Sequence, residues 1–570
     1  MKLQCKRGLC LLLSAILLLS LAACGGGAET ADPTAGFADA EEYHGELPFV
    51  KHGEEPITIT IGINTNGNVT DYENNEFTNW LEEQTGLKLD FVQFSGKAAE
   101  NATQIALMIA SGEKLPDIMH PGGISKVQAD EYGLDGYFLD LKPYFDHYAY
   151  YFNDAFARMY PDDPSVREQL MAYSTELDSG KIFNFPTIDD IPTDTPRGHT
   201  WINQEWLDKL GLETPRTLSE LHDVLVAFRD RDPNGNGKKD EIPMTGRADN
   251  GAADIVNFLI NPYVYWNMSY HFNVGEDGKL YTPYTTDEYR QALCLVNDWV
   301  KEGLLSTLTW TQTAEELKGL INPENGECLC GIVTGNAVLI FAQNSPSLYA
   351  YEPLAPLKGE TPLGGYGART SIVFYNTISV SATCEHPVEA FKLLDFMSSD
   401  EAYFRGHKGV PGVNWEFVDP DATYGGVGQG AAYRTIGDSI LNTQNNINWH
   451  NPWVIIKQGY HPVAPSEDEW TNVRAEKIRR NYENFVAAGQ PEKLFTYVNY
   501  THAEEELRSE FAKEVADYVK DRRAQFCTGV LDPRSDAAWR EYLDGLKALR
   551  YDEWLSIAQT AYDRMPENVK

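Results

Sequence analysis

The first regular alternation of apolar and polar positions begins after Pro56. Residues 57–67, ITITIGINTNG, alternate as a half-buried strand does and then enter a polar Asn-Gly loop. A helical spacing around Trp80 and Leu81 follows, LKLDFVQF then predicts a second strand, residues 98–111 a helix, and LPDIMH a buried strand. This order of strands and helices predicts an α/β fold with a mainly parallel sheet.

A different pattern, in residues 230–243, places oxygen-bearing side chains at alternate positions. In DRDPNGNGKKDEIP, acids and amides alternate, and Gly237 follows where a calcium loop needs its sharp turn. A lysine backbone carbonyl and two further carboxylates would complete the coordination. Pro243 stands at the twelfth position, where an EF-hand has a bidentate Glu, so no second pairing helix is implied. The predicted calcium ligands are Asp232, Asn234, Asn236, Lys238, Asp240 and Glu241.

The alternative for this loop is a metal-free Asn-Gly turn, because turns of this composition are common. The alternation in register with the glycine favours calcium. The wider stretch from Trp201 to Pro243 resembles the matching segment of large lipoprotein solute-binding proteins of bacterial ABC sugar importers. A similar loop holds calcium in the alginate-oligosaccharide-binding members of that group. The resemblance therefore implies Ca²⁺ as a structural cofactor here.

The start of the chain has the pattern of an export signal. Lys2, Lys6 and Arg7 precede an uncharged apolar run, which ends in Leu-Ala-Ala and Cys24. Small residues before a cysteine are similar to the lipobox of bacterial lipoproteins, in which the cysteine is acylated, for example with palmitate, and becomes the mature N-terminus. A transmembrane helix is the alternative, but the run is short for a span of ~20 residues.

Composition limits the partners of the chain. From residue 28 to residue 55 it has eight acids against Lys51 and few large apolar residues, which predicts a disordered acidic stalk. The net charge of −37, which becomes more negative when three cations leave with the signal, argues against nucleic acid as a partner. Five cysteines remain besides Cys24, an odd number at irregular spacing, so we expect buried thiols rather than a disulfide framework.

Two further segments carry the resemblance and divide the chain into lobes. GKIFNFP, residues 180–186, resembles the point at which maltose-binding-type proteins leave the first lobe, and residues 376–409 resemble the return to it. The tail, residues 526–564, is similar to the helical C-terminus of these lipoproteins. Its apolar positions recur at helical spacing and should pack against a lobe, namely Trp539, Tyr542, Leu543, Leu546 and Leu549.

The resemblance implies a two-lobed α/β fold of the periplasmic-binding-protein type II, with a hinge and extra C-terminal helices. The expected organisation is a signal peptide at 1–23, a lipidated N-terminus and flexible stalk at 24–55, a first lobe at 56–190 plus about 372–425, a second lobe at 197–371 with the calcium loop 232–243, and the remainder of the lobes with the C-terminal helical region at 426–570.

Motifs for catalysis are absent from the sequence. It contains no P-loop, no Gly-x-Ser-x-Gly elbow and no His-Glu-x-x-His. Carboxylate pairs carry no information in a chain with 84 acids, because a glycosidase needs a defined carboxylate separation. A secreted glycan hydrolase or lyase stays open as an alternative, and so does a binding protein for a peptide-like solute.

The aromatic content is typical of a sugar binder, since flat rings stack on sugar faces while Asn, Asp and Arg bond the hydroxyls. We nevertheless expect most of the 12 tryptophans and 31 tyrosines to lie in hydrophobic cores. We predict ligand contacts from residues at strand ends, crossovers and polar loops, and Arg369 could meet a uronate carboxylate or form a structural ion pair. The candidates are Asn66, Asp117, Trp201, Tyr366, Arg369, Trp415, Trp449 and Trp453.

The resemblance implies an exported protein, lipid-anchored through Cys24 at the extracytoplasmic face of the cell membrane. It would capture an oligosaccharide between its lobes and deliver it to the permease subunits of an ABC transporter, acting as a monomer and without catalysis.

Overall fold

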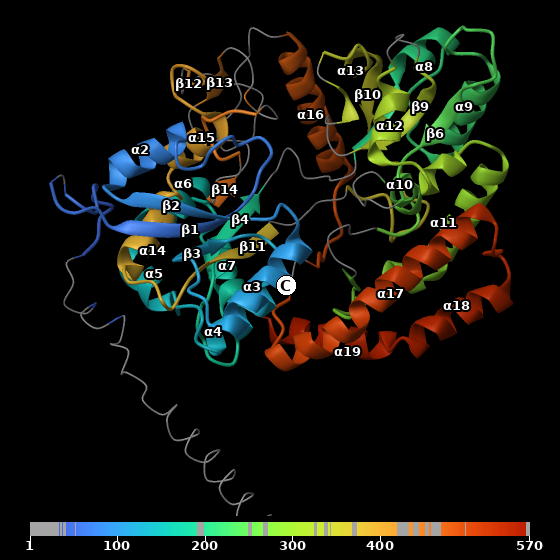
Figure 1. Cartoon of the computed structure of the whole chain (residues 1–570). Coiled ribbons are helices and arrows are strands. Elements are labelled where there is room, and N and C mark those ends of the chain that lie inside the picture. Colours follow the sequence, from blue (N-terminus) through green and yellow to red (C-terminus); the bar gives the residue numbers. More distant parts are fainter. Residues whose placement is uncertain are drawn as a thin grey trace, which may run out of the picture.

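The protein is built around two separate β-sheets, which Figure 1 shows on either side of the molecule. This computed structural model describes residues 34, 37, 42–51, 53–190, 199–248, 254–265, 272–323, 328–335, 340–342, 344–367, 373–418, 432–436, 440, 444–450, 455–457, 469–495 and 498–565. The signal and Cys24 lie outside these residues, as do Arg369 and Trp453. Part of the predicted stalk is described, and it is packed rather than disordered there, because Phe37, Tyr43 and Val50 are buried in a core cluster with residues of the first sheet.

The first sheet has six strands in the order β14-β4-β11-β3-β1-β2. Neighbours pair in parallel except around β11, which runs antiparallel to both β3 and β4. The strands are β1 (Thr58–Asn64), β2 (Lys88–Phe94), β3 (Ile118–His120), β4 (Phe185–Asp190), β11 (Val373–Val380) and β14 (Ile455–Lys457). The alternation that predicted β1 is confirmed, because Ile59, Ile61 and Ile63 are buried.

Helices cover this sheet and begin and end at recognisable residues. Asn75 caps the first turn of α2, and Gly86 ends that helix with a φ of 73°. The predicted helix at 98–111 is confirmed as α3, and its buried Ile105 and Met108 belong to a core cluster beside the sheet. The helices of this half are α2 (Glu76–Thr85), α3 (Ala98–Ser111), α4 (Lys126–Leu134), α5 (Lys142–Tyr148), α6 (Tyr150–Met159), α7 (Ser165–Ser174), α14 (Pro387–Phe396) and α15 (Asp400–Lys408).

The second sheet has four strands in the order β10-β5-β9-β6. These are β5 (His199–Asn203), β6 (Ile242–Thr245), β9 (Cys330–Gly335) and β10 (Tyr351–Leu354), and β5 runs antiparallel to both β9 and β10. Around them lie α8 (Gln204–Leu210), α9 (Leu218–Asp230), α10 (Ile255–Ile260), η3 (Pro283–Thr285), α11 (Asp287–Lys301), η4 (Thr307–Trp310), α12 (Ala314–Ile321) and α13 (Ser347–Ala350). Two small hairpins pair β7 (Asn273–Val274) with β8 (Leu280–Tyr281), and β12 (Trp415–Phe417) with β13 (Tyr433–Thr435).

The C-terminal helices extend the core of the second half. They are α17 (His502–Thr528), α18 (Asp536–Ala548) and α19 (Tyr551–Arg564), and they share one apolar cluster with α9, α10 and α11. The predicted packing of the tail is confirmed. Trp539, Tyr542 and Leu546 are buried, and Leu543 and Leu549 pack against the same cluster.

One long helix, α16 (Glu469–Ala488), runs between the two sheet-bearing parts in Figure 1 and contacts β10. None of the helices in the described part of the chain combines the length and apolar character that a membrane crossing needs. The lobe boundaries stay predictions. The sheets show, however, that residues 455–457 join the first sheet, although they follow the segment predicted for that lobe.

Candidate functional site

Two connections between strands of the two sheets show which strand ends lie on the same side of the molecule as the crossings. β4 ends at Asp190 in the first sheet, and the next strand, β5, begins at His199 in the second. β10 ends at Leu354 in the second sheet, and β11 begins at Val373 in the first. In open α/β sheets, ligands bind outside the carboxyl ends of strands. The strand ends on this side, named the crossover ends, are therefore the candidate ligand site.

The crossover end of the first sheet is rich in amide side chains. β3 runs antiparallel to β11, so β1 and β3 end on this side at Asn64 and His120. Asn101 of α3 is fully buried, and its Nδ2 donates to Asn64 Oδ1 at 2.6 Å and to the Pro121 carbonyl at 2.5 Å. A single amide thus ties together the ends of two strands. The half-buried Asn66 lies in the same loop, where its Oδ1 accepts from the Asn68 amide.

Glycines let the backbone approach these amides closely. Gly122 and Gly123 have φ values of 65° and 87°, which strain other residues. A Cβ on Gly122 would lie 2.6 Å from Asn64 Nδ2, and one on Gly123 would lie 2.1 Å from the Ala98 carbonyl oxygen. The loop after β3 therefore requires both glycines in order to pack against α3 and β1.

A distant segment, residues 444–450, adds further amides to this end. Asn445 bridges to Val69, and Asn446 Nδ2 donates to the Asn74 carbonyl at 2.6 Å. Asn75 donates in return to the carbonyl of Asn448 at 3.1 Å. The loop after β1 is thus held by a segment about 370 residues later in the sequence.

The crossover end of the second sheet repeats this arrangement. β6 ends at Thr245, and Gln312 Nε2 donates to Thr245 Oγ1 at 2.9 Å and to the Gly246 carbonyl at 2.5 Å. Gln312 is buried, and its Oε1 has no hydrogen-bond partner. The half-buried Trp310 lies two residues away, next to Thr309, whose carbonyl accepts from the Ala248 amide.

Tyr366 lies in the crossover from the second sheet to the first. Its carbonyl accepts from Asn261 Nδ2 at 2.7 Å, and its ring meets that of Tyr265 edge to face at 6.1 Å. The next residue, Gly367, donates to the carbonyl of Gly489 at the end of α16. Tyr366 is partly exposed between these elements, so it remains a candidate ligand contact.

Asp117 does not lie with these residues, which corrects the prediction for it. It precedes β3, at the sheet end opposite His120, and its carbonyl accepts from the Ser381 amide. Its carboxylate accepts from the amide of Thr60 at 2.9 Å and from the hydroxyl of Thr60 at 2.7 Å. Asp117 therefore fastens β3 to β1.

Three predicted aromatic contacts are core residues instead. Trp201 is fully buried in β5 and packs edge to face on Phe341. Trp415 is 3% exposed and donates through Nε1 to the Gly409 carbonyl, and Trp449 is 2% exposed and donates to Thr78. None of these rings presents a free face to a ligand in this structure.

The predicted calcium loop places its acids and amides together. Asn234 and Asn236 donate through Nδ2 to Asp240 Oδ1 at 3.2 and 3.1 Å, and the Gly237 amide donates to Asp232 Oδ2 at 3.0 Å. Gly235 and Gly237 have φ values of 75° and 71°, as the tight turn requires. The loop is therefore already wound around its polar side chains.

Its carboxylates also crowd one another. Burial, and after it the charges of Asp232 and Asp240, raise the pKa of Glu241. Glu241 Oε1 is buried without a hydrogen-bond partner. Among the described residues, no three His, Cys, Asp or Glu side chains are arranged to hold a metal on their own. A calcium ion here would also need amide oxygens and the Lys238 carbonyl, as the predicted set does.

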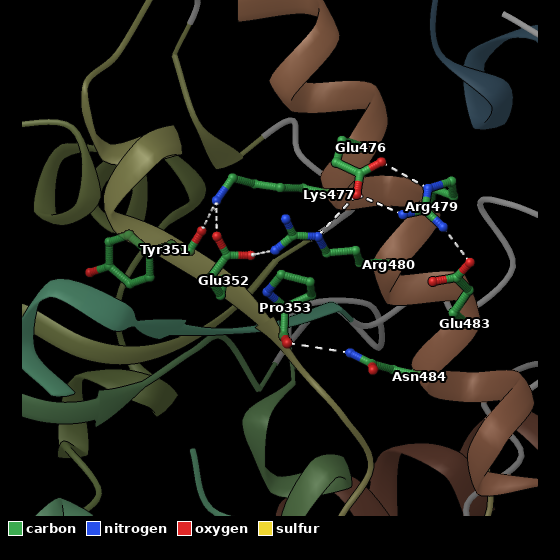
Figure 2. A network of polar contacts seen from close by, with 9 residues as sticks. All are labelled: Tyr351, Glu352, Pro353, Glu476, Lys477, Arg479, Arg480, Glu483 and Asn484. Carbon is green, nitrogen blue, oxygen red and sulfur yellow. Dashed lines mark hydrogen bonds and ion pairs between the residues drawn. The ribbon is translucent and has the colours of Figure 1, made fainter. Parts of the chain in front are cut away.

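A polar network fixes α16 to β10, as Figure 2 shows. Lys477 is buried and donates to the Tyr351 carbonyl and, at 2.9 Å, to Glu352. Arg480 reaches the other oxygen of Glu352 at 3.0 Å, and Asn484 donates to the Pro353 carbonyl. Along the helix, further ion pairs join Glu476, Arg479 and Glu483.

Sequence reasoning did not identify Asn101, Gln312, Trp310 or His120 as site residues. For Trp310 and Gln312, the sequence does offer a signal, the uncharged run LSTLTWTQT at 305–313 between two helices. A polar loop with one tryptophan is typical of a binding surface. The contact between Gln312 and Thr245 spans 67 residues, so no local pattern indicates it.

The family model of the bacterial extracellular solute-binding proteins matches residues 66–404. Among curated proteins, the fructooligosaccharide ABC transporter substrate-binding protein FusA of Streptococcus pneumoniae is 31% identical over 232 residues, 40% of this chain and 40% of FusA. Lipoprotein LipO of Bacillus subtilis is 26% identical over 235 residues, 38% of this chain and 44% of LipO. The polygalacturonan/rhamnogalacturonan-binding protein YtcQ of the same species is 34% identical over 95 residues, 16% of this chain and 18% of YtcQ. These matches span less than half of each relative.

Solved structures match nearly the whole chain. FusA in complex with kestose is 20% identical, with a TM-score of 0.69 over 89% of this chain and 99% of FusA. A solute-binding protein of Bifidobacterium longum subsp. infantis is 20% identical, with a TM-score of 0.71 over 90% and 99%. The alginate-binding protein AlgQ2 without calcium ion is 23% identical, with a TM-score of 0.61 over 90% and 99%.

These likenesses confirm the predicted two-lobed, type II α/β fold. The matched family consists of binding proteins, so the alternative of a glycan-degrading enzyme is not supported. With more than half of its residues matched by the family model, the chain belongs to the bacterial extracellular solute-binding proteins.

Proposed function

We propose that this protein captures an oligosaccharide between its lobes and delivers it to an ABC permease. At the crossover end of each sheet, a buried amide binds the side chain of the last strand residue: Asn101 binds Asn64, and Gln312 binds Thr245. This concentration of uncharged polar groups at both ends is the observation that carries the proposal. Such groups both donate to and accept from sugar hydroxyls. The relatives support the class of ligand, because FusA is described as a fructooligosaccharide-binding protein and has been solved with kestose.

Capture in this arrangement depends on contact with both lobes. A ligand that touches only one lobe binds the open and closed forms equally and shifts neither population. Asn64 and Asn66, which are partly exposed, would serve the first lobe, Trp310 the second, and Tyr366 the crossover. Bound sugar would then favour the closed form, which a permease can distinguish from the open one.

A thermal-shift panel with scattering tests the proposal. Purified protein is mixed with oligosaccharides and, in a separate arm, with a peptide pool, and the unfolding midpoint and radius of gyration are measured. We expect at least one oligosaccharide to raise the midpoint and to make the protein more compact. A response to peptides alone, or mass spectra that show the bound sugar being shortened, would contradict the proposal.

We also propose a structural calcium ion in the loop 232–243. Three carboxylates that crowd each other, one with a buried oxygen that lacks a partner, form a donor set that fits a hard dication. The ligands would be Asp232, Asn234, Asn236, Asp240, Glu241 and the Lys238 carbonyl, with the asparagine amides turned so that their oxygens face the ion. Solved structures of an EF-hand mutant of FusA and of AlgQ2 without calcium ion support this assignment.

Attachment to the outer face of the membrane through acylated Cys24 is the third part of the proposal. Its support is the Leu-Ala-Ala-Cys ending of the apolar run and the similarity to lipoprotein LipO. In cells that express Cys24→Ala protein, we expect the protein to leave the membrane fraction. A variant that is cut to the same mature size and stays membrane-bound would disprove the anchor. Gel filtration tests the expected monomer.

A further inference from the structure

Part of the segment that the composition predicts as a disordered stalk is bound to the first lobe. Phe37 and residues 42–50 are called the N-terminal strap. Phe37, Tyr43 and Val50 are buried, and all three belong to the same apolar cluster as the strands and helices of the first lobe. The side chains of the strap therefore have defined partners, which the acidic composition of the segment does not indicate.

Phe37 packs into a cluster of aromatic rings on α5. Its ring meets those of Tyr144, His147 and Tyr148 edge to face, with centroid distances of 5.0, 5.4 and 5.2 Å. Edge-to-face pairs of aromatic rings are favourable beyond the burial of their area and depend on orientation. Three such contacts to one side chain indicate a specific position for Phe37 on the first lobe.

A lysine on α14 binds the second ring of the strap. Lys392 Nζ lies 4.7 Å from the ring centroid of Tyr43 and 5.1 Å from that of Tyr148, so one cation contacts a ring of the strap and a ring of α5. Lys392 is half-buried, and cation–π contacts are stronger where the cation is withdrawn from water. The Tyr43 ring also meets the rings of Tyr148 and Tyr150 edge to face.

The rest of the strap is bound through its backbone. The Gly45 carbonyl accepts from the hydroxyl of Tyr151 on α6 at 2.9 Å. The amides of Phe49 and Val50 donate to the carbonyl of Thr85, the last residue of α2, at 2.8 and 3.1 Å. The strap thus contacts α5, α14, α6 and α2, all of which are helices of the first lobe.

The position of the strap limits the distance between this lobe and an anchor at Cys24. Figure 1 shows α5 and α14 on the side of the first lobe that lies away from the second sheet. Twelve residues, 25–36, separate Cys24 from Phe37, so this distance is at most about 45 Å, against about 110 Å for a free stalk that ends at Glu55. The shorter limit is close to the diameter of one lobe, which is about 40 Å for roughly 200 residues.

We infer that the strap orients the protein on the membrane. By binding the α5–α14 side of the first lobe it holds that lobe close to the lipid anchor, so that the second lobe is the one that moves when the lobes close. The inference rests on the proposed function, because it needs the anchor at Cys24 and the movement of the lobes. It goes beyond that function by assigning the fixed and the moving lobe.

The first test measures binding of the strap in soluble Cys24→Ala protein, and it is therefore independent of the anchor. Glutamyl endopeptidase cuts after glutamate, and the exposed Glu46 lies in the strap between Tyr43 and Val50. Mass spectrometry follows cleavage at Glu46. Because cleavage of a bound segment requires its local release, we expect the double variant Phe37→Ala, Tyr43→Ala to be cut there about tenfold faster.

Phe272→Ala is the matched control for this test. Phe272 is also a buried phenylalanine with two ring contacts, to Phe495 and Trp554, but it lies in the core of the second lobe. The control should lower the unfolding midpoint and change the cleavage rate at Glu46 by less than about twofold. Equal rates in the wild type and the double variant, or equal acceleration in the double variant and the control, would overturn the inference.

The second test measures which lobe lies nearer the bilayer. Acylated protein is bound to phosphatidylcholine vesicles that contain an acceptor-labelled lipid, with a donor dye at Asp146 on α5 or at Glu213 in the second lobe, both of which are exposed. We expect stronger energy transfer from position 146 than from position 213, and a smaller difference in the double variant. Equal transfer from both positions in the wild type would overturn the orienting role and leave the anchor intact. Acylated protein that does not bind vesicles would refute the anchor, and with it the orienting role.

Discussion

Arg523 on α17 and Asp254 at the start of α10 form a nearly inaccessible ion pair, with 2.5 Å between Nη2 and Oδ2. Asp254 also accepts from the Val256 amide and so caps α10, while Arg523 Nη1 donates to Asn257 at 2.8 Å. The pair joins α17 to α10 through one set of hydrogen bonds.

Removal of one member of this pair should be costly, because it leaves the other charge buried without a counter-charge. We expect Arg523→Ala to lower the free energy of unfolding by about 3–5 kcal/mol. The matched control is Arg534→Ala, which breaks a half-exposed pair with Asp298 and should cost under ~1 kcal/mol. Urea denaturation measures both. Similar losses of unfolding free energy in the two variants would show that burial does not make the Arg523–Asp254 pair more important for stability.

The calcium proposal predicts a response to chelator. An ion bound only by the folded state stabilises it by roughly 2.7 kcal/mol at about a hundredfold excess over Kd. EDTA should therefore lower the unfolding midpoint, and Asp232→Ala should abolish that response. Asp230→Ala changes an exposed carboxylate nearby that binds Arg229, and it should keep the response. An unchanged response in the Asp232 variant would place the ion elsewhere.

Two tryptophans of the second lobe should respond in opposite ways. Trp201 is fully buried, so Trp201→Ala should cost about 3–5 kcal/mol of stability through the cavity it leaves. Trp310 is half-buried at the crossover end, so Trp310→Ala should cost less stability and weaken sugar binding several-fold through loss of a stacking face. Calorimetry of unfolding and of binding measures the two effects. An unaltered sugar affinity of the Trp310→Ala variant would show that Trp310 does not contact the ligand.

His407 on α15 predicts a dependence of stability on pH. Its ring stacks on Tyr403, and burial, followed by the nearby charges of Lys408 and His450, lowers its pKa to about 3. Between this pKa and the unfolded value of ~6.5, the unfolded chain binds more protons, so stability falls as pH falls through that window. The effect is at most a few kcal/mol, on the order of 1.4 per pKa unit.

The pH prediction is tested by the slope of the unfolding midpoint against pH from 7 to 4. His407→Gln should flatten this slope, because the variant has no group to protonate at that position. His44→Gln, at an exposed histidine, should leave the slope as in the wild type. Identical slopes in all three proteins would contradict the assignment of the acid sensitivity to His407.

Hydrophobic patterning predicted the elements well and the ligand contacts poorly. β1 and α3 could be predicted because one face of each is buried and the other is not. β5 could not be interpreted in this way, since all five of its residues, including Trp201, are buried. From its place beside a crossover, Trp201 was therefore predicted to contact the ligand, although both faces of its strand are covered.

Strand direction explains the error for Asp117. The residue precedes its strand, so in a parallel sheet it lies at the amino end, while ligands meet the carboxyl end near His120.

The prediction for Trp415 was wrong for another reason. Its ring packs in a cluster with Phe404, with ring centroids 4.6 Å apart, and with Phe417. The polar and glycine residues around Trp415 in the sequence do not indicate this packing.

The fixation of α16 on β10 has a consequence for the protein at high concentration. β10 is the outermost strand of its sheet, and such a strand can recruit a strand from another molecule through its unpaired backbone groups. Lys477 and Asn484 already occupy the carbonyls of Tyr351 and Pro353, and proline has no N–H to offer. The helix therefore covers this edge of the sheet and blocks the β-pairing through which two copies of the chain would otherwise associate.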